Sequence, residues 1–269
     1  MCKVRAPIGV FDSGVGGLTV LKALRAELPE ADYVYLGDTA RLPYGTKSAA
    51  TVARYSVQCA AALRACGIGC LVVACNTASA SALEELRHAY TDMPVVGVIQ
   101  PGAEAAVAAS RARSIAVIAT ESTIAGGAYQ RAIHAQAADA CVVARACSLF
   151  VALAEEGWTD GAVAEMVARR YFDGMFAGPR PPDTLVLGCT HFPARAAPIA
   201  AVLPAAVRIV DSAATTAAAV ASLLGGRAAV RGGGSVRWLA TDGAARFARV
   251  GSRFLGAAIA ASDVEIIDL

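Results

Sequence analysis

The chain has 269 residues, of which 56% are hydrophobic, and this is enough apolar material for one large buried core or two smaller ones. The net charge of +2 is too small to favour nucleic acid or an anionic membrane as a partner. With no export signal visible, the eight cysteines are expected to be reduced thiols, and their spacing matches no common zinc motif. We therefore expect a cytoplasmic protein with no structural metal and no membrane-spanning segment.

Short β-branched runs alternate with alanine-rich stretches along the chain, which is typical of parallel sheets joined by crossover helices. Several of these runs lack polar and apolar alternation, so we expect sheets that are covered on both faces. Helices are expected, for example, at residues 17–27, 48–65 and 79–89. The predicted strands are residues 8–11, 33–37, 70–74, 95–98, 115–118, 141–145, 184–188, 208–211, 236–240 and 264–268.

An internal repeat is visible in the order of the motifs. IGVFDS at residues 8–13 and IAVIAT at residues 115–120 each close a predicted strand, at an offset of 107 residues. VVACNT and VLGCTH follow later in each half, and their cysteines, Cys75 and Cys189, are 114 residues apart. Ligands of open α/β sheets bind at the carboxyl ends of the strands. The repeat therefore predicts two similar α/β halves that bring both cysteine turns to one cleft.

Cys75 and Cys189 each follow a predicted strand and precede a predicted helix. The free N–H groups and the dipole at a helix start stabilise a thiolate, which favours a reactive cysteine there. A small residue buried at a tight turn would explain either cysteine alone, but two matched positions favour a reactive pair. The remaining cysteines lack this setting and are expected to be inert: Cys2, Cys59, Cys66, Cys70, Cys141 and Cys147.

Polar residues beside the two cysteines are suited to binding a small acid. Asn76, Thr77 and Thr190 supply hydroxyl, amide and backbone N–H groups for a carboxylate, although Thr77 could equally be a helix cap. His191 could hold a proton for Cys189 or hydrogen-bond a ligand.

The turn DSGVGG after the first strand does not match the glycine pattern of phosphate-binding loops. We expect it to approach a small ligand closely, with Asp12 accepting an ammonium group. The segment Pro43-Tyr44-Gly45 is either a plain turn or a loop that lines the substrate.

Two thiols across one pocket suggest a specific reaction. One thiolate removes a proton from carbon and the other thiol returns a proton to the opposite face, which inverts a stereocentre without a cofactor. Hydrogen-bond donors around Asn76, Thr77 and Thr190 would stabilise the charge that develops.

Five motifs resemble those of glutamate racemases and occur in the same order: FDSGVGGLTV, YLGDTARLPYGTKS, VACNTASA, PVVGVIQPG and LGCTHFP. The resemblance covers residues 8–215. It implies two pseudo-symmetric, doubly wound α/β domains with mainly parallel sheets, formed by residues 1–98 with 212–269 and by residues 99–211, and an active site between them. It also implies cofactor-independent racemisation of glutamate, D-glutamate for peptidoglycan synthesis, and a homodimer.

The resemblance further implies roles for single residues. Cys75 and Cys189 match the catalytic pair, and Asp12, His191 and Glu155 match residues that assist the two thiols. Ser148 and Ala152 stand where the family has prolines, so the local loop shape is expected to differ but the chemistry is not. The expected substrate-binding residues are Asp12, Ser13, Pro43, Tyr44, Gly45, Asn76, Thr77, Thr190 and His191.

Two other functions remain open. A related racemase could act on aspartate or another small acid, and the size of the pocket would decide between these substrates. A binding protein, for instance a partner of DNA gyrase as reported for some family members, would not need both cysteines. The start of the chain lacks the extension of racemases that a peptidoglycan precursor activates, so we do not expect that regulation here.

Overall fold

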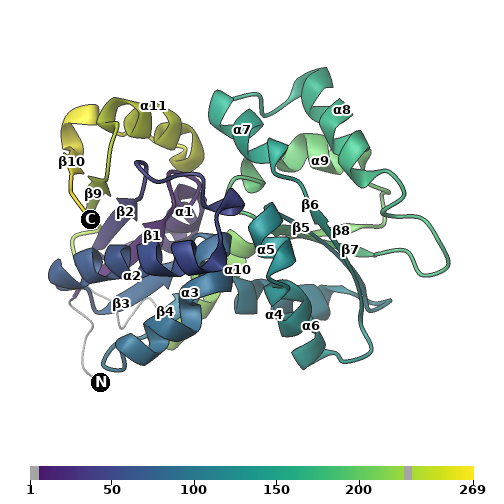
Figure 1. Cartoon of the computed structure of the whole chain (residues 1–269), viewed down its shortest axis with the longest axis horizontal. Coiled ribbons are helices and arrows are strands. Elements are labelled where there is room, and N and C mark those ends of the chain that lie inside the picture. Colours follow the sequence, from purple (N-terminus) through teal and green to yellow (C-terminus); the bar gives the residue numbers. More distant parts are fainter. Residues whose placement is uncertain (1–5, 227–231) are drawn as a thin grey trace.

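The computed structural model describes residues 6–226 and 232–269 of the chain (Figure 1). Its strands form two sheets, in which every pair of neighbouring strands is parallel. The first sheet contains β1 (Ile8–Asp12), β2 (Tyr33–Gly37), β3 (Cys70–Val73), β4 (Val95–Gly97), β9 (Val236–Ala240) and β10 (Val264–Ile266). The second contains β5 (Ser114–Ala119), β6 (Cys141–Ala146), β7 (Thr184–Gly188) and β8 (Arg208–Asp211).

The two sheets share one strand order. The first runs β10-β9-β2-β1-β3-β4 and the second runs β6-β5-β7-β8, so β5 is the counterpart of β1 and β7 is the counterpart of β3. This confirms the predicted pair of similar α/β halves. All ten predicted strands are present, with ends that differ from the prediction by at most two residues. The domain boundaries after residues 98 and 211 stay a prediction.

Helices connect the strands and cover both faces of each sheet. They are α1 (Leu18–Glu27), α2 (Ala49–Ala65), α3 (Asn76–Ala89), α4 (Ile99–Ala109), α5 (Glu121–Ala125), α6 (Ala128–Gln136), α7 (Leu149–Glu156), α8 (Gly161–Phe172), α9 (Ala196–Val202), α10 (Ser212–Leu223) and α11 (Ala244–Leu255). Short 3-10 helices occupy Tyr44–Thr46, Pro193–Arg195 and Ala261–Asp263.

The predicted start of α3 was wrong by three residues. The helix begins at Asn76, not at residue 79, because Cys75 itself serves as the cap: its Sγ accepts a hydrogen bond from the Ala78 N–H at 3.5 Å. Cap preferences favour Ser, Thr, Asp and Asn, so a cysteine in this role is not what the sequence pattern predicts. Asn76 and Thr77 therefore lie in the first helical turn, beside the thiol.

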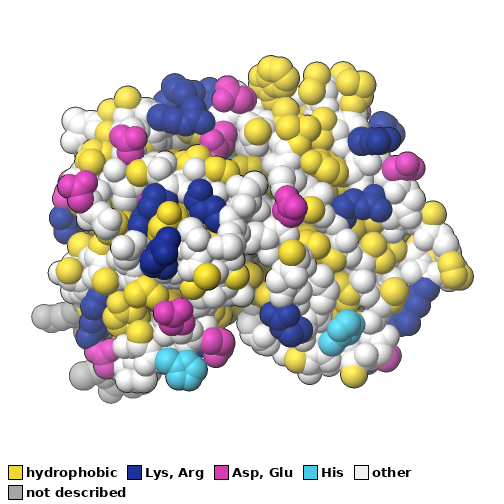
Figure 2. Space-filling view, in the orientation of Figure 1, with side chains coloured by type: hydrophobic (Ala, Val, Ile, Leu, Met, Phe, Trp, Pro, Cys, Tyr) yellow, Lys and Arg dark blue, Asp and Glu magenta, His cyan; other side chains and the backbone are white. Residues whose placement is uncertain are grey.

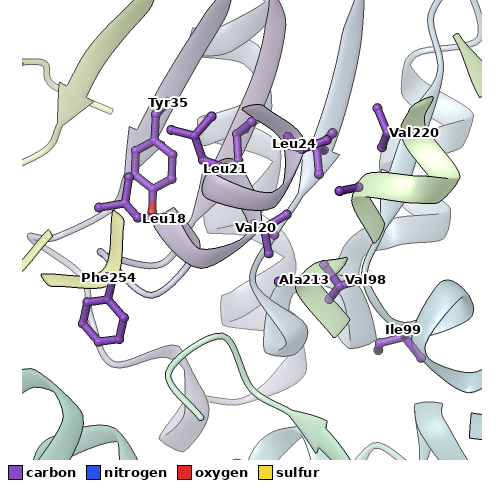
Figure 3. Packing of buried hydrophobic residues seen from close by; sticks show 14 of the residues in the cluster. Leu18, Val20, Leu21, Leu24, Tyr35, Val98, Ile99, Ala213, Val220 and Phe254 are labelled. Carbon is purple, nitrogen blue, oxygen red and sulfur yellow. The ribbon is translucent and has the colours of Figure 1, made fainter. Parts of the chain in front are cut away.

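One apolar cluster joins the two halves (Figure 3). Leu21 and Leu24 of α1 and Val220 of α10 belong to this cluster, as do Val98 at the start of α4 and Ile115 of β5. Burying one such side chain stabilises the fold by roughly 1.5–3 kcal/mol. Since the cluster includes residues of both sheets, it packs the half that carries β3 against the half that carries β7.

Basic and acidic side chains are interspersed on the face of the molecule shown in Figure 2, in keeping with the small net charge. Apolar side chains gather over α7 and α8 at the upper right of that view, where Trp158 and Met166 are exposed by 56% and 63%. No helix within residues 6–226 or 232–269 has the length and apolar content of a membrane span. The seven cysteines in these ranges are all free thiols, and Cys2 lies outside the described residues.

Candidate active site

A cavity of about 230 Å³ lies where the cysteine turns after β3 and β7 meet. Its walls come from both halves of the molecule. The structure brings all but one of the predicted site residues to this cavity: Ser13, Pro43, Tyr44, Gly45, Cys75, Asn76, Thr77, Glu155, Cys189, Thr190 and His191. The exception is Asp12.

Cys75 lies at the end of β3 and is 5% exposed. Its thiol donates to the Ser13 hydroxyl at 3.5 Å and accepts from the N–H of Ala78 at the helix start. Burial, with the nearby charge of Asp12, raises the pKa of Cys75 to about 12. This sulfur therefore carries its proton at neutral pH.

Cys189 occupies the equivalent position after β7, with a different neighbour. Its Sγ lies 3.8 Å from Nδ1 of His191, and Nε2 of the same ring lies 3.2 Å from Oε1 of Glu155. Burial opposes the imidazolium, but Cys189 and Glu155 outweigh it and raise the pKa of His191 to about 10. His191 is therefore protonated at neutral pH and places a cation beside the Cys189 sulfur.

Glu155 links this pair to the other half of the molecule. It lies on α7 and is largely buried, and its Oε2 accepts a hydrogen bond from Arg246 of α11 at 2.9 Å. Burial works to raise its pKa, but His191 and Arg246 hold the pKa of Glu155 below its ordinary value. Glu155 is thus an ionised partner for the His191 imidazolium.

Asp12 lies behind the cavity wall. It is fully buried, its Oδ2 accepts the Gly14 N–H at 2.9 Å, and its Oδ1 has no hydrogen-bond partner among the described residues. Burial raises the pKa of Asp12, and His191 partly offsets this. This position fits a charged neighbour of Cys75 better than a direct contact with a ligand.

Donors for a carboxylate line the cavity beside both thiols. Oδ1 of Asn76 accepts a hydrogen bond from the Tyr129 hydroxyl at 2.7 Å. The buried Nδ2 of Asn76 has no hydrogen-bond partner among the described residues. A buried donor without a partner is costly, so a ligand oxygen at this position would satisfy it. Thr77 Oγ1 lies 2.9 Å from the hydroxyl of Thr120 and 3.1 Å from that of Thr123, across the two halves.

The glycine-rich turn after β1 packs directly against the second cysteine turn. A Cβ on Gly16 would lie 2.5 Å from both the His191 ring and Oγ1 of Thr190, a distance that real side chains do not tolerate. Thr19 also donates to the Thr190 carbonyl at 3.1 Å. The turn thus lies close to protein groups of the site, and its residues Ser13 and Gly14 line the cavity, while its close approach to a ligand stays a prediction.

The segment Pro43-Tyr44-Gly45 lines the cavity and is held from behind. The Tyr44 hydroxyl donates to the carboxylate of Asp38, which also binds Arg41 at 2.7 Å and Thr241 at 2.9 Å. Tyr44 is fully buried, so its hydroxyl is occupied within the fold.

Comparisons with known proteins agree with this geometry. A model of the family described as Asp/Glu/Hydantoin racemase matches residues 18–220. A glutamate racemase from Geobacter metallireducens is 52% identical over 253 residues, which make up 93% of this chain and 92% of that protein. The chain belongs to the Asp/Glu/hydantoin racemase family.

Solved structures of glutamate racemases show the same fold as this family member. That of the Francisella tularensis protein, in complex with D-glutamate, has a TM-score of 0.90 at 35% identity and covers 98% of both chains. That of the Thermus thermophilus protein, in complex with beta-chloro-D-alanine, has a TM-score of 0.88 at 42% identity and covers 99% of this chain and 98% of that one. The resemblance seen in the sequence motifs is therefore confirmed, as is the α/β fold that it implied.

Some residues of this racemase-family site were not predicted. Thr120 lines the cavity at the position that the 107-residue offset pairs with Ser13, so the repeat contained a signal for it. Arg246 had no such signal, because its partner Glu155 is 91 residues away in the chain. Ser148 and Ala152, at which the resemblance led us to expect prolines, also line the cavity at the start of α7.

Proposed function

We propose that the chain interconverts L- and D-glutamate by a cofactor-independent reaction of two thiols. The observation that carries the proposal is that Cys75 and Cys189, from equivalent turns of the two halves, are free thiols on one cavity. The names of the relatives supply the substrate. The cavity supports it, because donors for a carboxylate lie beside both sulfurs.

In each direction one cysteine acts as thiolate and the other as thiol. The thiolate takes the proton from the α-carbon, and the electron pair of the broken C–H bond moves into the α-carboxylate. Asn76, Thr77 and Thr190 stabilise the charge that develops there. The second thiol then donates its proton from the opposite face, and the stereocentre is inverted.

The neighbouring residues divide between the two thiols. His191, supported by Glu155, assists Cys189, and Asp12 assists Cys75. Ser13 and the segment Pro43-Tyr44-Gly45 hold the rest of the substrate against the first half.

Three parts of the proposal rest on the family resemblance alone. They are the use of D-glutamate in peptidoglycan synthesis, the location in the cytoplasm, and the homodimer. Sedimentation of the purified protein would test the last, since a single species with the mass of one chain at all concentrations would contradict it.

Circular dichroism of purified protein with L-glutamate, without pyridoxal phosphate or metal, tests the reaction. We expect the substrate signal to decay to zero. Cys75→Ser and Cys189→Ser should each lower the rate by roughly 10²–10⁴-fold, the usual contribution of a general acid or base. Cys141→Ser, at a cysteine away from the cavity, is the matched control and should keep full activity.

Each other result contradicts a definite part of the proposal. Decay with aspartate but not glutamate would keep the mechanism and change the substrate. No decay with either would favour a binding protein. Full activity in both cysteine variants would exclude the two-thiol mechanism.

A further inference from the structure

We propose that Arg246 is a positioning residue for this reaction, which holds Glu155 so that Glu155 in turn holds His191 beside Cys189. The inference rests on the proposed racemase function and deepens it. It assigns a role to a residue of α11, a helix that carries none of the predicted site residues.

The contacts form an unbroken line from the surface to the sulfur. Arg246 binds Oε2 of Glu155 at 2.9 Å, the other oxygen of that carboxylate lies 3.2 Å from His191 Nε2, and His191 Nδ1 lies 3.8 Å from Cys189 Sγ. Exposure falls along the line, from 51% for the Arg246 side chain to 14% for Glu155 and 8% for His191. Both carboxylate oxygens are thus fixed, one by each neighbour.

Helix α11 touches this region at two further points, which makes the Arg246 contact part of an interface. The ring of Phe254 meets the His191 ring edge to face, with centroids 5.1 Å apart. The guanidinium of Arg253 lies against Gly157, the residue that ends α7, where an added Cβ would be only 2.5 Å away. Figure 1 shows α11 and α7 facing each other across the two halves.

The two thiols differ in this respect. The hydrogen-bond partners of Cys75, Ser13 and Ala78, both belong to the first half of the molecule, as does the nearby carboxylate of Asp12. The support of Cys189 instead ends on a residue from the other half. The chain of contacts that supports Cys189 therefore depends on how the two halves are placed, whereas the hydrogen bonds of Cys75 lie within one half.

The charge of Arg246 acts on Glu155 together with other groups. His191 and Cys189 face Glu155 from the turn after β7, Asp12 lies behind the turn, and Asp242 lines a small cavity with Glu155 and Arg246. Arg246 is one of the groups that keep the pKa of Glu155 low. Without it, that pKa rises, Glu155 takes up its proton at a higher pH, and His191 loses its ionised partner earlier as the pH falls.

The test compares Arg246→Met, Arg246→Lys and Arg249→Met with the unaltered chain. Arg249 is exposed on the same helix and does not line the cavity, so its variant controls for the loss of one arginine from α11. Initial rates of L- and D-glutamate racemisation are measured by circular dichroism from pH 5 to pH 10, with thermal melting of each variant as a check of folding.

We expect Arg246→Met to lower kcat/KM roughly 10- to 100-fold at neutral pH, as a displaced catalytic neighbour does. The acid limb of its pH–rate profile, where kcat/KM falls as the pH is lowered, should move to higher pH. Its melting temperature should stay close to that of the Arg249→Met control, since a half-exposed ion pair contributes little to stability. Arg246→Lys should recover most of the activity, because the single contact to Oε2 needs only a positive donor.

Other outcomes would overturn the inference. One is an unchanged kcat/KM and pH profile in Arg246→Met. The other is a loss of activity in Arg246→Met that is explained by a lower melting temperature, with the acid limb of the pH–rate profile unmoved. If the unaltered chain does not racemise glutamate at all, the proposed function fails first, and that result is seen before any variant is compared.

Discussion

The two cysteines occupy equivalent turns but have different chemical surroundings. Cys75 is surrounded by a hydroxyl, an N–H and the buried Asp12, and its pKa is raised to about 12. Cys189 instead faces His191, whose pKa of about 10 leaves it protonated in neutral solution. Two equivalent turns thus present a protonated thiol at Cys75 and, at Cys189, a sulfur beside a cation.

The raised pKa of Cys75 predicts slow alkylation that depends steeply on pH. At pH 7 iodoacetamide should modify Cys75 only slowly, because only the thiolate reacts and a pKa of about 12 keeps almost all of this sulfur protonated. The rate at Cys75 should rise about tenfold for each pH unit below that pKa, in step with its thiolate fraction. Mass spectrometry of the digested protein measures this rate, with the fully buried Cys59 as an unreacted control. Rapid labelling of Cys75 at pH 7 would contradict this account.

At the scale of an element, the segment between β2 and α2 depends on one buried carboxylate. Asp38 is fully buried and binds Arg41, Tyr44 and Thr241. It therefore holds Arg41 and Tyr44 within the segment, and it links the segment to Thr241 in the turn after β9. Asp38→Asn removes the charge but keeps the shape. Breaking a buried pair costs on the order of 3–5 kcal/mol, and we expect about 1–3 kcal/mol here because Arg41 keeps contact with water.

The same change should raise the KM for glutamate, since Tyr44 and Gly45 line the cavity. Thermal melting and steady-state kinetics measure the two effects. Asp92→Asn breaks an exposed pair with Arg64 and is the matched control, with a much smaller expected change in either quantity. A variant of Asp38 that melts and binds like the unaltered chain would show that the segment holds its shape without this carboxylate.

The strands could be predicted from the sequence, whereas the supports of the site could not. Runs such as LVVA and LVLG are apolar on both faces, and only a buried strand of a covered sheet accommodates them, so their positions were predicted almost to the residue. The start of α3 was missed because a cysteine caps it. The contact of Arg246 with Glu155 and that of Thr77 with Thr120 join residues far apart in the chain, and no local pattern encodes such pairs.

At the scale of the whole molecule, polar contacts cross between the halves on several sides of the cavity. Thr77 meets Thr120 and Thr123, the Ser122 hydroxyl donates to the Lys47 carbonyl at 3.3 Å, and Arg246 binds Glu155. The buried cluster that includes residues of α1 and α10 joins the halves by apolar contacts. Polar contacts between domains exchange with water more readily than apolar ones, so we expect movement of the halves to open the cavity at these contacts.

A ligand that touches both halves should therefore stabilise the whole fold. Glutamate at about 100 times its dissociation constant adds about 2.7 kcal/mol of stability, which raises the melting temperature of a chain of this size by roughly 5–10 °C. In the unaltered protein L- and D-glutamate should give the same shift in melting temperature, because the reaction turns either one into the same mixture before melting.

In Cys189→Ser the enantiomers stay distinct, and their different contacts with the two halves should give unequal shifts in melting temperature. Differential scanning calorimetry with each enantiomer, and with glutamine as the control that lacks the second carboxylate, measures this. Unequal shifts in the unaltered protein would contradict racemisation, and equal shifts from glutamine would contradict recognition of both carboxylates.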